Sequence, residues 1–128
     1  MEPIGYVENE FSEPVYDEDV YDSVSKIVIC EEFSDGLYKI QEFDRLQVLF
    51  YFSRSKDYEL IQRRSHDGQM AGVFATRSPK RPNSIGLTTV MLMDVEDNTL
   101  YVKGLDAING TPVLDIKPCL REYDKEKD

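Results

Sequence analysis

Residues 87–105 have the sequence LTTVMLMDVEDNTLYVKGL, which is typical of a β-hairpin. Two short runs rich in branched and aromatic residues, 87–95 and 99–105, flank the polar triplet Glu96-Asp97-Asn98. Polar turn-forming residues between two such runs predict antiparallel strands joined by a tight turn. Met91 and Met93 are two positions apart on the first strand, so they share a face, and we expect them in the core.

Further strand-like runs lie on both sides of this hairpin. They occupy residues 3–7, 26–30, 46–52 and 70–75. One short helix is predicted at 35–40, with Ser34 as its N-cap, and the acidic stretch 8–25 reads as a long loop. The sequence therefore predicts a mainly β protein, a small antiparallel β-barrel with one or two short helices. We expect a single domain over residues 1–122 and a charged tail at 123–128.

Composition excludes several classes of protein. The chain has 128 residues, with 25 acidic and 15 basic side chains and a formal net charge of −10. No run approaches the roughly 18 apolar residues of a membrane span, and the first residues do not resemble a secretory signal, so we expect a cytoplasmic protein. A single histidine and two cysteines outside any CxxC pattern predict no metal site. Neither GxGxxG nor GxxxxGK[ST] occurs, so the common nucleotide-binding folds are not expected.

The charge is distributed unevenly along the chain. Residues 1–60 have 15 acidic and 5 basic side chains, and residues 94–128 have 9 acidic and 5 basic ones. Residues 61–93 instead have five basic side chains and one acidic one, a net charge of +4. A net charge of −10 repels phosphate, but the local field matters more to a ligand than the total.

The basic segment contains the sequence GVFATRSPKRPNSIGL at residues 72–87. Pro79 and Pro82 each fix a φ angle and favour extended conformations in the residues before them. Arg77, Lys80 and Arg81 are therefore held in defined directions, which suits a loop that binds a carboxylate or phosphate. The alternative is a solvated loop that its prolines stiffen.

A second informative segment is GLDAINGTPVLDIKP at residues 104–118. Asn109-Gly110 followed by Thr-Pro predicts a turn. Asp115 and Lys117 are two positions apart, so in an extended segment they point to the same face. Taken alone, this pair is a surface ion pair worth about 0–1 kcal/mol.

Together these two segments resemble the hallmark sequences of the TsaA/TrmO-type family, and the likeness extends more weakly over about residues 3–122. The resemblance implies a β-barrel enzyme that uses S-adenosyl-L-methionine to methylate tRNA. The implied acceptor is the exocyclic nitrogen of threonylcarbamoyl-adenosine beside the anticodon. It also implies a homodimer with the cofactor in a pocket near the subunit boundary.

The resemblance assigns roles residue by residue. For substrate binding it implies Arg81, Asn83 and Lys117. Because a nitrogen bonded to both an adenine ring and a carbonyl is a poor nucleophile, a general base would help, and Asp115 is the candidate. Ser53 stands where the family usually has a histidine, and the loop over 11–25 is acidic. The cofactor-binding residues that it implies are Arg77, Leu87, Ser53, Arg54, Asp106, Ala107, Ile108 and Asn109.

The chemistry of these side chains suits the implied reaction. Methyl transfer from a sulfonium is an in-line displacement, so positioning supplies much of the acceleration. Asp106 and the backbone near it can face the cofactor's positive charge. Arg77 or Arg81 can pair with the threonyl carboxylate of the acceptor.

Two other functions fit the same residues. The first is a sensor or adaptor that binds S-adenosyl-L-methionine without catalysis, which the serine at position 53 and the acidic loop would favour. The second is a methyltransferase for a small anionic metabolite, which the acidic exterior would suit. For the tRNA enzyme, we expect weak and strongly salt-dependent tRNA affinity, because only the basic segment favours phosphate.

Overall fold

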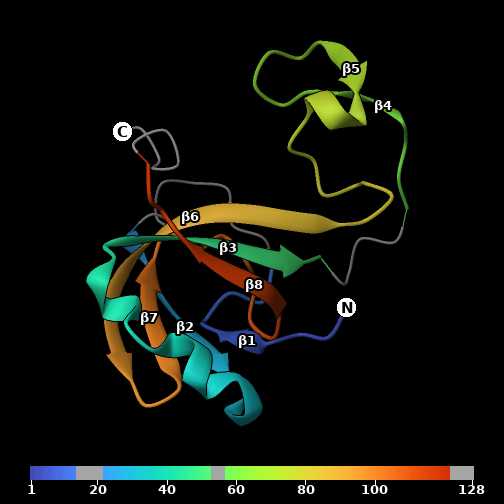
Figure 1. Ribbon diagram of the computed structural model, residues 1–128. Helices are drawn as coiled ribbons and strands as arrows, with labels where there is room; N and C mark the ends of the chain where they lie inside the picture. Colours follow the sequence, from blue (N-terminus) through green and yellow to red (C-terminus); the bar gives the residue numbers. More distant parts are fainter. Residues whose placement is uncertain (14–21, 53–56, 122–128) are drawn as a thin grey trace.

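The computed structural model describes residues 1–13, 22–52 and 57–121, and its centre is a closed six-stranded antiparallel barrel (Figure 1). The predicted mainly β fold and the small antiparallel barrel are thus confirmed. Around the barrel the strands follow the order β1-β2-β7-β6-β3-β8, and β8 pairs with β1 to close it. The strands are β1 (Gly5–Glu8), β2 (Val24–Ile29), β3 (Arg45–Tyr51), β6 (Ile85–Glu96), β7 (Thr99–Lys103) and β8 (Pro112–Pro118).

The barrel forms because its strands alternate between inward and outward side chains. In β3, Leu46, Val48 and Phe50 are at most 1% exposed, while the residues between them are half-buried. The same alternation buries one face of β1, β2 and β7, while β8 buries Val113 alone. The inward side chains of these strands meet in a single core, which contains Val7, Ile27, Ile29, Leu46, Val48, Phe50, Val90, Leu100, Val102 and Val113.

The hairpin expected over 87–105 is present as β6 and β7, with Asp97 at a positive φ of 53° in the turn. One part of the expectation is wrong. Met91 and Met93 are 40% and 47% exposed, so they lie on the outer face of the barrel and not in the core.

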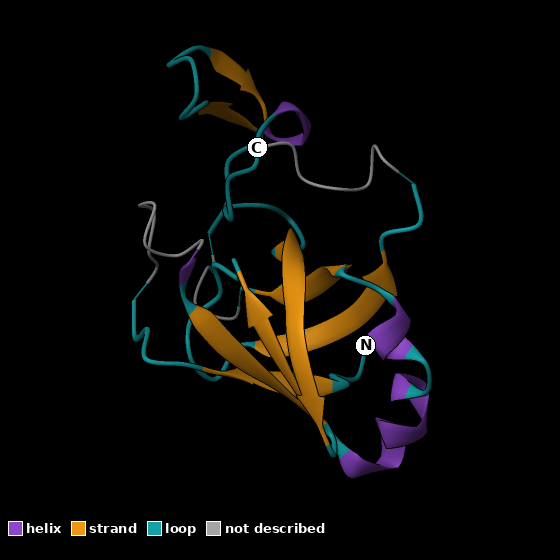
Figure 2. Ribbon diagram, turned by 90° about the vertical axis from the view of Figure 1, so that its left-hand side faces the viewer, coloured by secondary structure: helices purple, strands orange, loops and turns teal. Residues whose placement is uncertain are grey.

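The predicted helix at 35–40 is also wrong. The chain instead forms two 3-10 helices, η1 (Glu31–Leu37) and η2 (Ile40–Glu42), with the left-handed residue Lys39 before the second. Ser34 lies inside η1 and donates its hydroxyl to the carbonyl of Glu31, so it is not an N-cap. Figure 2 shows both segments against one end of the barrel. Among the described residues, no helix combines the length and apolar character needed to cross a lipid bilayer.

The connection between β3 and β6 projects from the barrel, and we call its described part, residues 57–84, the arm (Figures 1 and 2). Its elements are β4 (Ile61–Arg63), β5 (Met70–Gly72) and the 3-10 helix η3 (Val73–Ala75). Strands β4 and β5 pair only with each other. At the base of the arm, the Tyr51–Ile85 pair and the bond from the Phe52 N–H to the Ser84 carbonyl join β3 to β6.

Three sequence expectations need correction here. The run 70–75 is a strand only to Gly72, because Val73–Ala75 turns into η3. Strand β4 was not expected, since Ile61–Arg63 has only one apolar residue. Strand β8 was treated only as an extended segment, because prolines stand at both its ends. The expected tail and part of the acidic loop lie outside the described residues.

Gly86 allows the ring of Phe50 to pack directly against β6. A Cβ atom at position 86 would lie 2.7 Å from two atoms of that ring and 2.8 Å from the ring of Phe52. We expect Gly86→Ala to lower the free energy of unfolding by about 1–3 kcal/mol, because the packed rings must shift. Urea denaturation measures this change. Gly36→Ala is the matched control, because nothing lies within 4 Å of its added Cβ; equal stability of the two variants would contradict the prediction.

Candidate cofactor and substrate site

Arg77 and Leu87 lie in direct contact where the arm returns to the barrel. The Arg77 Nη2 atom donates a hydrogen bond to the Leu87 carbonyl oxygen over 2.7 Å. Arg77 directly follows the end of the η3 turn, and Leu87 lies near the start of β6. Both residues are exposed, so the guanidinium is held in place by one bond and keeps other N–H groups for a ligand.

The next residue of β6 connects this pair to the second hallmark segment. The Thr88 hydroxyl donates a hydrogen bond of 2.6 Å to Oδ1 of Asp106, which lies in the loop between β7 and β8. The exposed Asp106 carboxylate keeps its second oxygen for other partners. We call Arg77, Leu87, Thr88 and Asp106 the Arg77–Asp106 cluster. It places an exposed cation and an exposed anion at two consecutive residues of β6.

Residues 107–109, which were predicted to bind the cofactor, follow Asp106 in the loop between β7 and β8. Hydrogen bonds from the N-terminal segment fix this loop. The side chain of Asn9 donates to the Ala107 carbonyl over 2.8 Å and to the Ser25 hydroxyl over 3.1 Å. The Asn9 backbone N–H donates to Oδ1 of Asn109, and the Asn109 N–H donates to the Phe11 carbonyl. Ala107 is buried, whereas Asn109 is exposed at the surface of the loop.

Arg81 stabilises the loop that contains the predicted anion-binding residues. Its Nη1 atom donates to the Thr76 carbonyl over 2.9 Å and to the Ser78 carbonyl over 3.1 Å. These bonds place Arg81 beside the backbone of Arg77 and hold the proline-rich loop closed. Asn83 is exposed, and its backbone carbonyl accepts the N–H of Ile85 at the start of β6.

Asp115 and Lys117 lie on the outer face of β8, as the spacing predicted. Their Oδ2 and Nζ atoms are 2.9 Å apart, and the side chains are 49% and 60% exposed. Asp115 Oδ1 also accepts the N–H of Ile116, so both carboxylate oxygens have partners. Leu49 of β3 pairs with both Leu87 and Asp115, so one strand separates Asp115 from the cluster. The roles of Asp115 as a base and of Lys117 in substrate binding stay predictions.

Two predicted cofactor residues, Ser53 and Arg54, lie outside the described residues. Sequence reasoning in turn missed Asn9 and Thr88. Asn9 bonds residues 98 and 100 positions away, and Thr88 bonds a residue 18 positions away. No local pattern marks such residues, because their roles depend on partners that only the closed barrel brings near.

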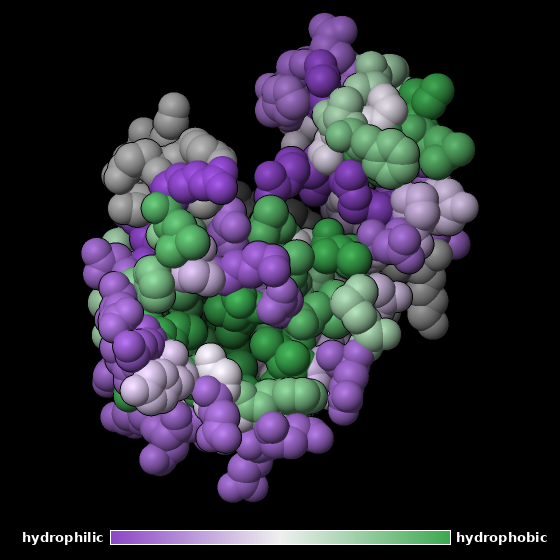
Figure 3. All heavy atoms as spheres, viewed as in Figure 1, coloured by the Kyte–Doolittle hydropathy of each residue, from purple (hydrophilic) through white to green (hydrophobic). Residues whose placement is uncertain are grey.

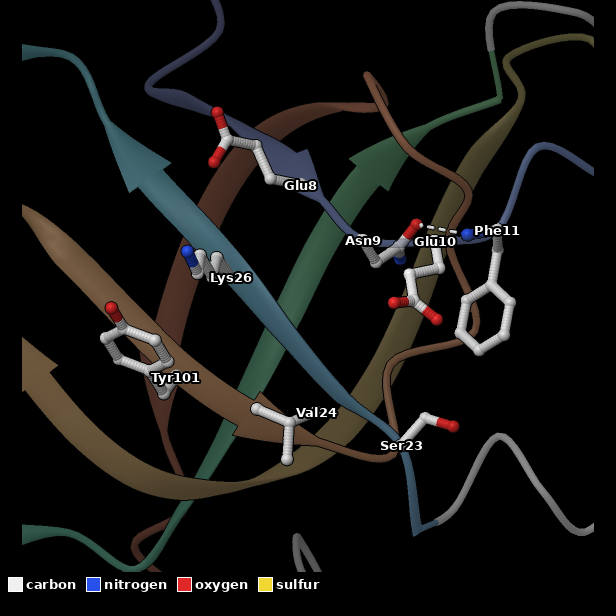
Figure 4. A pocket seen from close by; sticks show the side chains of 8 residues that line it. All are labelled: Glu8, Asn9, Glu10, Phe11, Ser23, Val24, Lys26 and Tyr101. Atoms are coloured by element: carbon white, nitrogen blue, oxygen red, sulfur yellow. Dashed lines mark hydrogen bonds between the residues drawn. The ribbon is translucent and has the colours of Figure 1, made fainter.

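A cavity of about 560 Å³ opens beside the N-terminal segment (Figure 4). Asn9 is one of its lining residues and also binds the 107–109 loop, whereas none of the predicted site residues lines it. Lys26 lies over the ring of Tyr101, with its Nζ atom 5.7 Å from the ring centre. Partial burial and the neighbouring Glu96 carboxylate raise the pKa of Tyr101. The cavity is lined by Glu8, Asn9, Glu10, Phe11, Ser23, Val24, Lys26 and Tyr101.

No group of three or more His, Cys, Asp and Glu side chains gathers as a metal-ligand set within residues 1–13, 22–52 and 57–121. The Arg77–Asp106 cluster offers a guanidinium and a carboxylate, which suits an organic ligand with both charges.

Comparison with known proteins identifies the family. The family model described as the tRNA-methyltransferase O N-terminal domain matches residues 6–125. The chain belongs to this family. The crystal structure of TrmO superposes with a TM-score of 0.80 at 30% sequence identity, covering 98% of this chain and 59% of that one. The TrmO family resemblance read from the two hallmark segments is thus confirmed.

Individual relatives within the TrmO family differ in how much of their length this chain spans. An S-adenosyl-L-methionine-binding protein of Archaeoglobus fulgidus is 39% identical over 127 residues, which is 97% of this chain and 91% of that protein. A probable S-adenosyl-L-methionine-binding protein of Pyrococcus abyssi is 38% identical over 127 residues, and the match covers 95% of this chain and 68% of that protein. The rat tRNA (adenine(37)-N6)-methyltransferase is 37% identical over 134 residues, covering 96% of this chain and 31% of that enzyme.

Proposed function

We propose that this protein is an S-adenosyl-L-methionine-dependent tRNA methyltransferase. Its substrate is the threonylcarbamoyl-adenosine beside the anticodon, and the methyl group goes to the exocyclic nitrogen. The observation that carries the proposal is the Arg77–Asp106 cluster, which joins the two hallmark segments of the TrmO family in one exposed site. Relatives named as S-adenosyl-L-methionine-binding proteins and as a tRNA methyltransferase support it. A tRNA substrate also agrees with the expected cytoplasmic location.

The residues of the cluster fit the cofactor chemically. When bound, S-adenosyl-L-methionine supplies a methyl group on a sulfonium centre. The Asp106 carboxylate favours a nearby positive charge, and the Arg77 guanidinium favours a carboxylate. The side chain of Leu87, which is 40% exposed, offers an apolar contact, and the backbone of residues 107–109 offers hydrogen-bonding groups.

Mass spectrometry of tRNA from a strain that lacks this protein tests the assignment. We expect the methylated form of threonylcarbamoyl-adenosine to disappear and the unmethylated form to accumulate. Unchanged methylation would refute the tRNA assignment. Calorimetry that shows cofactor binding without transfer to any tRNA would instead favour the sensor or adaptor.

Asp106→Asn tests the role of the carboxylate in cofactor binding. The amide oxygen of asparagine can still accept the Thr88 hydroxyl, so the loop stays in place while the negative charge is lost. We expect the affinity for S-adenosyl-L-methionine in calorimetry to fall about 10-fold, the loss typical of one charged contact. Asp94→Asn removes an exposed carboxylate farther along β6 and should leave the affinity unchanged. Equal affinities for the wild type and Asp106→Asn would count against the site.

A homodimer is part of the proposal, and the outer face of β6 supports it. Four exposed apolar side chains lie there, interrupted by Thr89 and close to the predicted cofactor contact, and such a strip is typical of a protein interface. The strip consists of Ile85, Leu87, Met91 and Met93, which are 36%, 40%, 40% and 47% exposed. Their position agrees with a cofactor pocket near the subunit boundary.

Light scattering tests the dimer. We expect a mass about twice 14.8 kDa for the wild type and a shift to monomer for Met91→Glu, because a charge in the strip opposes its burial. Val24→Glu changes an exposed residue on β2 and should leave the mass unchanged. A monomeric wild type would contradict this part of the proposal.

A further inference from the structure

The arm is an ordered projection that the barrel does not use for its own packing. Its strands pair only with each other, and a two-stranded hairpin alone is only marginally stable in water. Three contacts fasten it internally: the side chain of Gln62 donates to the carbonyls of Lys80 and Glu59, and the Val73 N–H donates to the Leu60 carbonyl. Val73 is only 1% exposed. The arm thus holds its shape but leaves most of its surface to solvent.

Most cations of the arm have no acidic partner among the described residues. Arg64 is the exception among its lysines and arginines, since it pairs with Asp67 at 2.5 Å, and His66 lies 3.6 Å from the same carboxylate. The Gln69 backbone N–H and the Arg64 guanidinium hold the pKa of Asp67 below its ordinary value. Arg63 donates instead to the Gly68 carbonyl over 2.6 Å, and this bond orients the guanidinium without cancelling its charge. Lys80 is exposed.

This positive charge contrasts with the rest of the chain. The arm, residues 57–84, has five basic and three acidic side chains, a net charge of +2 within a total of −10, which leaves −12 for the remaining residues. A polyanion that approaches the protein is therefore repelled by most of the surface and attracted to this part of it. Figure 3 shows hydrophilic residues at the tip and base of the arm and hydrophobic ones on its outer side.

The arm also exposes aromatic rings to solvent. Phe74 in η3 is 83% exposed, and Tyr58 at the start of the arm is 51% exposed. A base of a nucleic acid can stack on such a ring whatever its identity, and one stacked base contributes about 5- to 100-fold to affinity. Arg77 follows Phe74 by three residues, so the chain runs from the arm directly into the Arg77–Asp106 cluster.

We propose that the arm is the RNA-docking surface of this protein, with Phe74 stacking on an unpaired base and Arg63 and Lys80 contacting phosphates. The inference rests on the proposed tRNA substrate and adds where that substrate is held. The exposed Ile61 and Met70 would also suit a protein partner. Arg63 and Lys80, which have no acidic partner among the described residues, lie on the same arm as an exposed ring, and this combination favours RNA.

Binding of a tRNA transcript, followed by fluorescence anisotropy over a range of KCl concentrations, tests the inference. Phe74→Leu keeps an apolar side chain and removes the ring, and we expect it to weaken binding about 5- to 100-fold. Arg63→Gln and Lys80→Gln should each reduce the slope of log affinity against log salt by about 1. Lys39→Gln, at the opposite end of the barrel, is the control and should bind as the wild type does. Cofactor affinity should stay unchanged in all four variants.

The outcomes separate this inference from the proposed function. If the wild type methylates tRNA and Phe74→Leu binds RNA equally well, the inference is wrong and the function stands. If the arm variants lose RNA affinity while the wild type transfers no methyl group, the inference stands and the function is wrong. If the variants change the oligomeric mass and leave RNA affinity unchanged, the arm is a protein interface and the inference is overturned.

Discussion

Replacing Arg77 with lysine is expected to lower methyl transfer at least about 100-fold. The Nη2 atom of Arg77 is fixed by the Leu87 carbonyl at 2.7 Å, which leaves the rest of the planar guanidinium directed at a ligand. A lysine has a single ammonium group, so it cannot keep the carbonyl bond and also present a fixed pair of donors. Losing a positioned charged donor from an active site typically reduces the rate by about two to three orders of magnitude. Single-turnover kinetics with tRNA measures the effect.

The control for this prediction is Arg45→Lys. Arg45 begins β3 and lies outside the predicted site, so its variant should transfer methyl groups at the wild-type rate. Circular dichroism should show that both variants are folded. If Arg77→Lys retained more than about one tenth of the wild-type rate, Arg77 would not hold a ligand in the way that its geometry indicates.

Replacing Phe50 with alanine is expected to lower the free energy of unfolding by about 3–5 kcal/mol. Phe50 is 1% exposed, and its ring packs edge-on against Phe52 with 5.0 Å between the ring centres. Gly86 on β6 provides the space for the Phe50 ring. Removing the ring therefore leaves a cavity that β6, which has no side chain at this position, cannot fill. Urea denaturation measures the loss, and Phe50→Leu should fall between the alanine variant and the wild type.

Phe74→Ala is the matched control for Phe50→Ala. It removes the same ring from a position that is 83% exposed, so we expect a change of at most about 0.5 kcal/mol. A loss at Phe74 as large as that at Phe50 would mean that the arm, and not the barrel, limits the stability of the protein.

The barrel was predictable because its strands are rich in branched and aromatic residues and are bounded by polar turn residues. Residues 46–52, 87–95 and 99–105 were predicted as strands on this composition, and the structure has β3, β6 and β7 there. The helix at 35–40 failed because the same polar and apolar spacing also suits successive 3-10 turns, which bury only part of Phe33, Leu37 and Ile40. The exposure of Met91 and Met93 was not predictable, since an exposed apolar strip and a core strand have the same composition.

The candidate site was predictable in its parts but not in its assembly. Arg77 and Leu87 came from a resemblance between sequences, and no pattern indicated that the guanidinium would bond the Leu87 carbonyl. Thr88 and Asn9 were missed because each acts through a partner far along the chain. The Asp115–Lys117 pair was predicted from spacing alone, because the period of a strand fixes which neighbours share a face.

Transfer of a labelled methyl group tests the central claim most directly. The purified chain is incubated with S-adenosyl-L-methionine that carries an isotopically labelled methyl group and with tRNA from a strain lacking the protein. The tRNA is then digested to nucleosides for mass spectrometry. We predict label on the exocyclic nitrogen of threonylcarbamoyl-adenosine, and its loss in Arg77→Lys. Absence of label from every tRNA nucleoside, in a preparation that binds the cofactor, would contradict the account.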